Sequence, residues 1–64
     1  MWYYVTSERT IPTDRDLMLA VEDKDDFAVL EFPCRWANGQ WIGARTGRLI
    51  DVHPTHWREW LEEN

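Results

Sequence analysis

Two short apolar runs with a polar stretch between them dominate the first half of the chain. The first run covers Leu17 to Val21 and the second covers Phe27 to Phe32, while Glu22 to Asp26 between them is acidic apart from one lysine. Two apolar runs joined by a tight polar turn are typical of a β-hairpin. A turn at Lys24-Asp25 gives the predicted cross-strand pairs, which are Val21 with Ala28, Leu19 with Leu30, and Leu17 with Phe32.

A second hairpin is predicted at Asn38-Gly39, because both residues tolerate the positive φ that a type I′ turn requires. This turn places Trp36 directly opposite Trp41, at the pair of positions next to the turn where side chains approach most closely. We therefore expect the two indole rings to be in contact.

A third turn is predicted at Thr46-Gly47. The pairs that follow from this turn are Arg45 with Arg48, Gly43 with Ile50, and Trp41 with Val52. In this arrangement Gly43 leaves room beside the two bulky indoles. The three turns together predict a meander of two or three antiparallel hairpins.

Alternation along these strands assigns their side chains to two faces of a sheet. The face expected to form the core comprises Leu17, Leu19, Val21, Ala28, Leu30, Phe32, Cys34, Trp36, Trp41, Ile50 and Val52. The apolar residues of the other face, a candidate interaction face, are Met18, Phe27, Val29, Ile42 and Leu49. Pro33 cannot donate to a ladder, so we expect the chain to bend there while the alternation continues.

The two ends of the chain carry different patterns. Trp2 to Val5 is aromatic and β-branched, which predicts a short first strand, and the polar stretch from Thr6 to Asp16 predicts a connecting loop. After Val52 the period changes, and a helix from Pro54 to Glu62 is predicted because proline suits the first helical turn. The residues expected to dock this helix on the sheet are Trp57, Trp60 and Leu61, spaced i, i+3 and i+4.

These elements predict one small domain over residues 1 to 64, in the α+β class and mainly β. The expected architecture is an antiparallel meander with one short C-terminal helix packed on it. Small β-meander domains that resemble SH3 barrels share this length and number of hairpins. The resemblance is one of architecture and carries no function.

Composition and charge narrow the expected function. The formal net charge is −5, which disfavours general binding to nucleic acid or to an anionic membrane surface. A single cysteine, the lack of a signal-peptide pattern and the lack of an apolar stretch near ~20 residues favour a cytoplasmic location. The five Trp, two Tyr and two Phe are expected to supply most of the core.

The residues that could carry chemistry are few. Cys34, His53 and His56 are the only soft metal ligands, but Cys34 falls on the apolar face and His53 precedes a proline that keeps it out of the helix. No oxyanion nest or nucleophile turn accompanies the cysteine. The acidic turn lacks the spacing of a calcium loop. We expect no metal, no cofactor, no small-molecule substrate and no enzymatic activity.

The most favoured function is a cytoplasmic protein-interaction module whose partner is another protein or a second copy of the chain. The apolar residues of the second face need a cover, and only Trp2 to Val5 can supply one from within the chain. The alternative is a nucleic-acid-related role. A basic and aromatic groove for single strands would use Arg35, Trp36, Trp41, Arg45 and Arg48, and an acidic phosphate mimic would use Asp23, Asp25 and Asp26.

Overall fold

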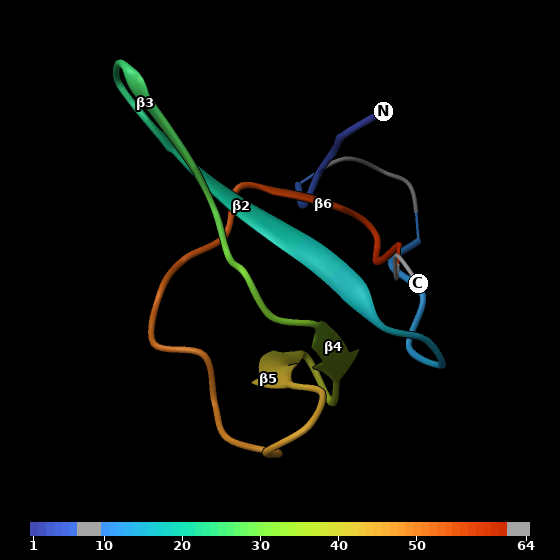
Figure 1. Cartoon of the computed structure of the whole chain (residues 1–64). Helices are drawn as coiled ribbons and strands as arrows, with labels where there is room; N and C mark the ends of the chain where they lie inside the picture. The colour runs from blue at the N-terminus through green and yellow to red at the C-terminus, as the bar shows by residue number, and fades with distance from the viewer. Residues whose placement is uncertain (7–9, 62–64) are drawn as a thin grey trace.

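The computed structural model describes residues 1–6 and 10–61, and this part of the chain is all-β. All of the strands pair antiparallel, as Figure 1 shows. The strands are β1 (Tyr3–Tyr4), β2 (Leu17–Asp23), β3 (Asp26–Val29), β4 (Cys34–Ala37), β5 (Gln40–Gly43) and β6 (His56–Glu59). The antiparallel sheet is therefore confirmed, and so is a short first strand.

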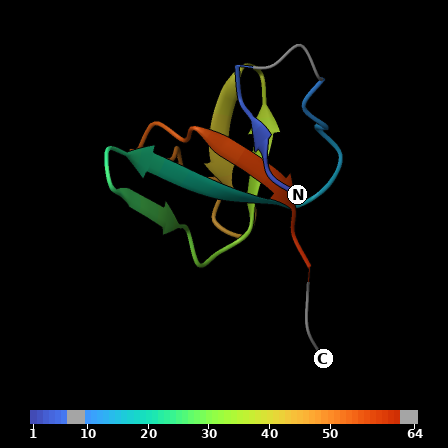
Figure 2. The same ribbon diagram turned by 90° about the horizontal axis from the view of Figure 1, so that it is seen from above.

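The sheet is built around β2. Its strand order is β1-β6-β2-β4-β5, and β3 pairs with β2 outside this path. Strand β6 lies along one edge of β2, whereas β3 and β4 follow each other along the opposite edge. Figure 2 shows β6 running between β1 and β2, which brings the two ends of the chain together in one sheet.

The first predicted hairpin is confirmed in its turn and in two of its three pairs. Lys24 adopts a positive φ of 53° in the turn, Val21 lies opposite Ala28, and the Leu30 amide donates to the Leu19 carbonyl at 2.9 Å. The third pair is wrong, because Leu17 lies opposite Cys34 rather than Phe32. The chain leaves the ladder between residues 30 and 33, where Pro33 has no N–H to donate.

The predicted bend at Pro33 keeps the alternation intact. The register changes there by two residues, from a ladder in which Leu19 meets Leu30 to one in which Leu17 meets Cys34. Because side chains alternate with a period of two, a shift of two residues leaves every side chain on its expected face. Cys34 accordingly lies in the core, as predicted.

The contact between the two indoles is confirmed. Trp36 lies opposite Trp41, and their ring centroids are 4.7 Å apart at an interplanar angle of 53°. Asn38 and Gly39 both adopt the positive φ that the turn requires, with values of 53° and 74°.

The third turn is longer than predicted. Gly43, not Arg45, lies opposite Arg48, because the Gly43 amide donates to the Arg48 carbonyl at 2.9 Å. The Gly47 amide donates back to the Gly43 carbonyl, also at 2.9 Å, and closes a four-residue loop. Ile50 rather than Val52 consequently pairs with Trp41, through an amide that donates to the Trp41 carbonyl at 2.9 Å.

The predicted helix from Pro54 onward is wrong within residues 54–61, and Glu62 lies outside the described residues. Strand β6 occupies this segment and pairs with β1 on one side and β2 on the other. Nine residues form only a marginal helix in water, whereas a strand between two neighbours satisfies its backbone groups on both edges. The i, i+3, i+4 spacing of Trp57, Trp60 and Leu61 therefore did not decide the structure.

The core is small and lies on one face of the sheet, which we call the inner face. Its fully buried side chains are Leu17, Leu19 and Cys34, and Trp57 of β6 joins them with 2% of its surface exposed. Tyr3 stacks on Trp57 with ring centroids 4.8 Å apart. The partly buried residues packed on this cluster are Tyr3, Val5, Ile11, Leu30, Trp41 and Ile50.

Five residues predicted for the core do not belong to it. Phe32 and Val52 are 45% and 44% exposed, Ala28 is exposed, and Val21 and Trp36 are half-buried outside the core cluster. Ala28 and Val21 belong to the hairpin of β2 and β3, whose tip projects away from the rest of the molecule in Figure 1. Near this tip Ala28 is therefore open to solvent and Val21 is only half-buried.

Candidate functional site

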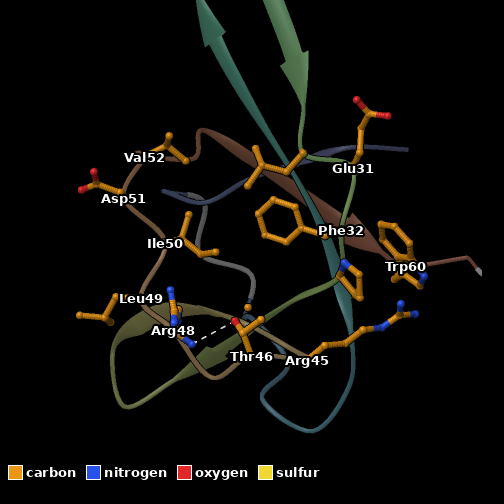
Figure 3. A pocket seen from close by; sticks show the side chains of 13 residues that line it. Glu31, Phe32, Arg45, Thr46, Arg48, Leu49, Ile50, Asp51, Val52 and Trp60 are labelled. Carbon is orange, nitrogen blue, oxygen red and sulfur yellow. Dashed lines mark hydrogen bonds between the residues drawn. The ribbon is translucent and has the colours of Figure 1, made fainter.

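A groove of about 610 Å³ opens on the inner side of the molecule between three connecting segments. Its walls come from the β3–β4 connection, the loop after β5 and the segment that leads toward β6, and Trp60 closes one end (Figure 3). The lining residues are Leu30, Glu31, Phe32, Pro33, Gly43, Arg45, Thr46, Arg48, Leu49, Ile50, Asp51, Val52 and Trp60. We call this site the Phe32 groove.

Backbone hydrogen bonds fix the walls of the groove relative to one another. The Ala44 amide donates to the Pro33 carbonyl at 2.9 Å and joins the loop after β5 to the β3–β4 connection. In the same loop, the Arg48 amide donates to Thr46 Oγ1 at 3.2 Å. A Cβ atom at Gly43 would lie only 2.7 Å from Thr46 Oγ1, so this loop shape requires glycine. Gly43 makes room for a hydroxyl, not for the indoles.

The middle of the groove is apolar and open to solvent. Phe32 projects its ring between the walls in Figure 3, with Ile50 and Val52 on the facing segment. Phe32 and Val52 each leave nearly half of their surface exposed. Small soluble proteins seldom gather exposed apolar side chains in a concave site without a use for them.

Trp60 is held at the end of the groove by its backbone and by packing. Its amide donates to the Asp16 carbonyl at 3.2 Å. The indole Nε1 is buried and has no hydrogen-bond partner among the described residues. The N–H is the one hydrogen-bonding group of an indole, and here it has no acceptor among the described residues. No side-chain hydrogen bond from these residues therefore fixes the orientation of the ring.

The charged residues of the groove are arranged by sign. In Figure 3, Arg45 and Arg48 lie along the wall that the loop after β5 forms, and Glu31 and Asp51 lie toward the opposite end. A ligand in the groove would therefore meet an apolar centre with cationic side chains on one side and carboxylates on the other. Arg35 takes no part, because its Nε donates to Asp16 Oδ1 at 2.9 Å outside the groove.

The predicted basic and aromatic groove is divided in the structure. Arg45 and Arg48 line the Phe32 groove, whereas Trp36 and Trp41 line a second hollow of about 410 Å³. Residues 49–52 border both hollows and lie between them. The two arginines and the two indoles therefore line two neighbouring hollows rather than one groove.

The face opposite the core, which we call the outer face, is partly covered by the N-terminal segment, as the sequence suggested. Trp2 meets the Phe27 ring edge-on with centroids 5.4 Å apart, and Tyr4 stacks on His56 at 4.4 Å. Phe27 also contacts His56 at 5.3 Å, and the Arg58 guanidinium lies 5.5 Å from the centre of the Trp2 ring.

The other members of the candidate interaction face differ in exposure. Met18 and Ile42 are half-buried. Val29 is 44% exposed, and Leu49, which forms a bridge with Ile42, is 63% exposed. The N-terminal segment therefore supplies a cover for Phe27 but leaves Val29 and Leu49 open.

The soft ligands do not converge. Cys34 is fully buried, burial raises the pKa of its thiol to about 11, and the Sγ–H donates to the Phe32 carbonyl at 3.5 Å. His56 Nδ1 lies 2.8 Å from Thr55 Oγ1 on the outer face, and His53 is exposed. Among the described residues, no three His, Cys, Asp or Glu side chains are grouped closely enough to hold a metal ion.

The sequence did not indicate the Phe32 groove. Alternation placed Phe32 and Val52 in the core, and the helical spacing placed Trp60 on a helix. A signal was present in Pro33, because a proline between two strands frees the residue before it from the ladder. Pro33 alone does not show which segment the Phe32 side chain faces, because that depends on where the next strand pairs.

The described residues contain no helix long and apolar enough to cross a membrane. Comparisons with protein-family models, with curated proteins and with solved structures found no match to this chain.

Proposed function

We propose that this chain is a non-enzymatic protein-interaction module that holds an apolar side chain of a partner protein in the Phe32 groove. The observation that carries the proposal is the groove itself, about 610 Å³ with Phe32 projecting between its walls and Val52 exposed on the facing wall. A volume of this size accepts one or two large side chains. Buried apolar anchors of this kind supply most of the binding energy at protein interfaces.

The rim of the groove suits an extended polypeptide. A peptide segment carries polar backbone groups and charged neighbours on both sides of its apolar anchor. The rim offers Arg48 to acidic neighbours, and Glu31 and Asp51 to basic ones. Complementary charge at a rim contributes to the choice and orientation of the partner more than to affinity.

A cytoplasmic location is part of this proposal. Its support is that the single cysteine, Cys34, is a free and fully buried thiol. A protein of this kind needs no disulfide and is compatible with a reducing compartment.

The nucleic-acid alternative has less support from the geometry. Single-strand binding needs stacking rings beside cationic side chains, and Trp36 and Trp41 line a different hollow from Arg45 and Arg48. Phosphate mimicry would use Asp23, Asp25 and Asp26, and all three are exposed at the hairpin tip. Exposed carboxylates in a turn equally serve solubility, so no observation favours that role.

The test compares two single substitutions in capture experiments from a lysate of the source cells. Val52→Asp places a charge on the apolar wall that faces Phe32, and Thr13→Asp adds the same charge at an exposed site of the 5–16 connection. We expect a partner that the wild type and Thr13→Asp retain and that Val52→Asp loses. Amide NMR spectra establish that both variants keep the fold.

Two results would overturn the proposal. One is a partner recovered equally well by Val52→Asp, which would place binding outside the groove. The other is a nucleic acid as the captured molecule, whose binding weakens steeply as salt rises while apolar anchoring does not.

A further inference from the structure

Strand β3 presents an unpaired backbone edge to solvent. It pairs only with β2, and the described residues supply no neighbour on its other side. Leu19 and Leu30 form a hydrogen-bonded pair, because the Leu30 amide donates to the Leu19 carbonyl. In an antiparallel ladder hydrogen-bonded and non-hydrogen-bonded pairs alternate, so Phe27 and Val29 direct their N–H and C=O groups away from β2.

The opposite edge of the same hairpin supports this assignment. Ala20 and Glu22 lie opposite Val29 and Phe27, so their backbone groups must also point outward, toward β6. There Thr55 pairs with two of these groups. The Glu22 amide donates to Thr55 Oγ1 at 2.8 Å, and the Ala20 carbonyl accepts from the Thr55 amide at 2.9 Å. On the β3 side of the hairpin, residues 1–6 and 10–61 supply no partner strand.

The free edge is accessible along its whole length. All four residues of β3 are exposed, and the hairpin extends away from the body of the molecule in Figure 1. Phe27 and Val29 leave 43% and 44% of their surfaces open beside the free backbone groups. Natural sheets protect such an edge with proline, a charged side chain, a bulge or a short strand. Strand β3 is short and its one charge, Asp26, lies at the turn, so the stretch from Phe27 to Val29 carries no proline, charge or bulge.

The charges around the edge select the kind of partner. Asp25 and Asp26 lie at one end of β3 and Glu31 lies just beyond the other, and Lys24 is the only cation from residue 22 to residue 31. A second copy that paired antiparallel about Ala28 would set Asp25 against Glu31 of the other chain. Like charges in this position disfavour self-association, and a strand with basic residues would be attracted.

We propose that the free edge of β3 binds an extended basic segment of a partner protein by β-strand addition. The backbone groups of Phe27 and Val29 hydrogen-bond to the added strand, and the carboxylates at both ends attract its lysine or arginine side chains. This surface shares Glu31 with the rim of the Phe32 groove, but the backbone groups of Phe27 and Val29 lie outside the groove, and the inference does not depend on the function proposed there.

The test uses an acetylated and amidated hexapeptide of alternating lysine and valine as the probe, with a glutamate and valine hexapeptide as the charge control. Binding to the isotope-labelled full chain is followed by NMR. We expect the basic probe to shift the amide signals of β3 and to slow hydrogen exchange at Phe27 and Val29. We expect the acidic probe to do neither, and the affinity for the basic probe to fall as salt increases.

A matched pair of variants identifies the backbone contribution. Val29→Pro removes an outward N–H that takes no part in the pairing with β2, and Val29→Ala removes most of the side chain but keeps that N–H. We expect Val29→Pro to weaken binding roughly tenfold or more, and Val29→Ala to change it much less. The wild-type exchange measurement remains decisive if Val29→Pro does not fold.

Several outcomes would overturn the inference. They are basic-probe binding that leaves the Phe27 and Val29 amides unprotected, no binding at all, and equal binding by Val29→Pro when that variant is folded. A molar mass that doubles without any peptide would show that a second copy occupies the edge instead.

Discussion

Replacing Thr55 by valine tests whether a single hydroxyl holds β6 against β2. Thr55 Oγ1 accepts a hydrogen bond from the Glu22 amide at 2.8 Å and lies 2.8 Å from His56 Nδ1. It also lies 3.3 Å from the Ala20 carbonyl, to which it can donate. Valine has nearly the same shape and an equal tendency to form strands, so the substitution removes these polar contacts with little change in packing.

The expected loss of stability is large for a domain of this size. The Glu22 amide is near the surface and regains water, so losing its bond to the hydroxyl costs about 1 kcal/mol. His56 is only 7% exposed, so its ring nitrogen loses a partner that water does not fully replace, at a further cost of about 1 to 2 kcal/mol. The sum is roughly half of the 3–5 kcal/mol typical of such a small core.

Urea unfolding followed by tryptophan fluorescence measures this loss directly, and the melting temperature should fall by roughly 10 °C. Thr55→Ser keeps the hydroxyl and should retain most of the stability, while Thr13→Val at an exposed site should change it by less than about 0.5 kcal/mol. The reasoning fails if Thr55→Val unfolds at the wild-type urea concentration. It fails equally if Thr55→Ser is destabilised as much as Thr55→Val.

Three further predictions follow from the packing of the sheet. A double-mutant cycle on Trp36→Ala and Trp41→Ala should give a coupling of about 0.5–1.5 kcal/mol, and additive effects would show that the 4.7 Å ring contact contributes nothing. Gly43→Ala should lower the melting temperature and Thr46→Ala should relieve much of that loss, since the new Cβ meets the Thr46 hydroxyl at 2.7 Å; no relief would contradict the steric reasoning. Because burial raises the pKa of Cys34 from 9.0 to about 11, its contribution to stability is complete below pH 9 and is lost as the pH rises toward 11. Urea midpoints across this range should fall more steeply for the wild type than for Cys34→Ala.

The turns of this fold are encoded locally and were therefore predictable. Asn38 and Gly39 tolerate a positive φ, and Lys24 adopts one in an acidic turn that has few alternatives. Both register errors, at Phe32 and at Val52, amount to two residues. A two-residue error leaves the alternation unchanged, which explains why the core residues Leu17, Leu19 and Cys34 were correctly identified.

The last strand was not predictable from its own residues. His56 to Glu59 becomes a strand because β1 and β2 each offer it an edge, and the side chain of Thr55 joins it to β2. These partners lie about 35 to 50 residues away in the sequence, and local spacing carries no information about them. Long-range pairing of this kind routinely overrides a weak helical pattern.

The candidate site depends on the same long-range information. Alternation correctly assigned Phe32 and Val52 to the inner face, but a residue on that face is buried only where another segment covers it. The loop after β5 and the strand β6 determine which part of the inner face is covered by other segments. Both differ from the prediction, because the loop has four residues and β6 is not a helix. Three of the tryptophans consequently lie in different places rather than in one core. Trp57 is in the core, Trp60 closes the groove, and Trp2 covers Phe27 on the outer face.

The two proposed surfaces have one structural origin in the break at Pro33. Strands β3 and β4 both lie along the same edge of β2, so the chain must leave the ladder between them. At this point Phe32 leaves the ladder and lines the groove. Strand β3 ends at Val29, and β4 does not pair with the edge of β3 that faces away from β2. The surfaces use different groups, side chains in the groove and backbone amides at the edge. Val52→Asp should therefore abolish anchoring in the groove without affecting the hexapeptide, and Val29→Pro should have the opposite effect.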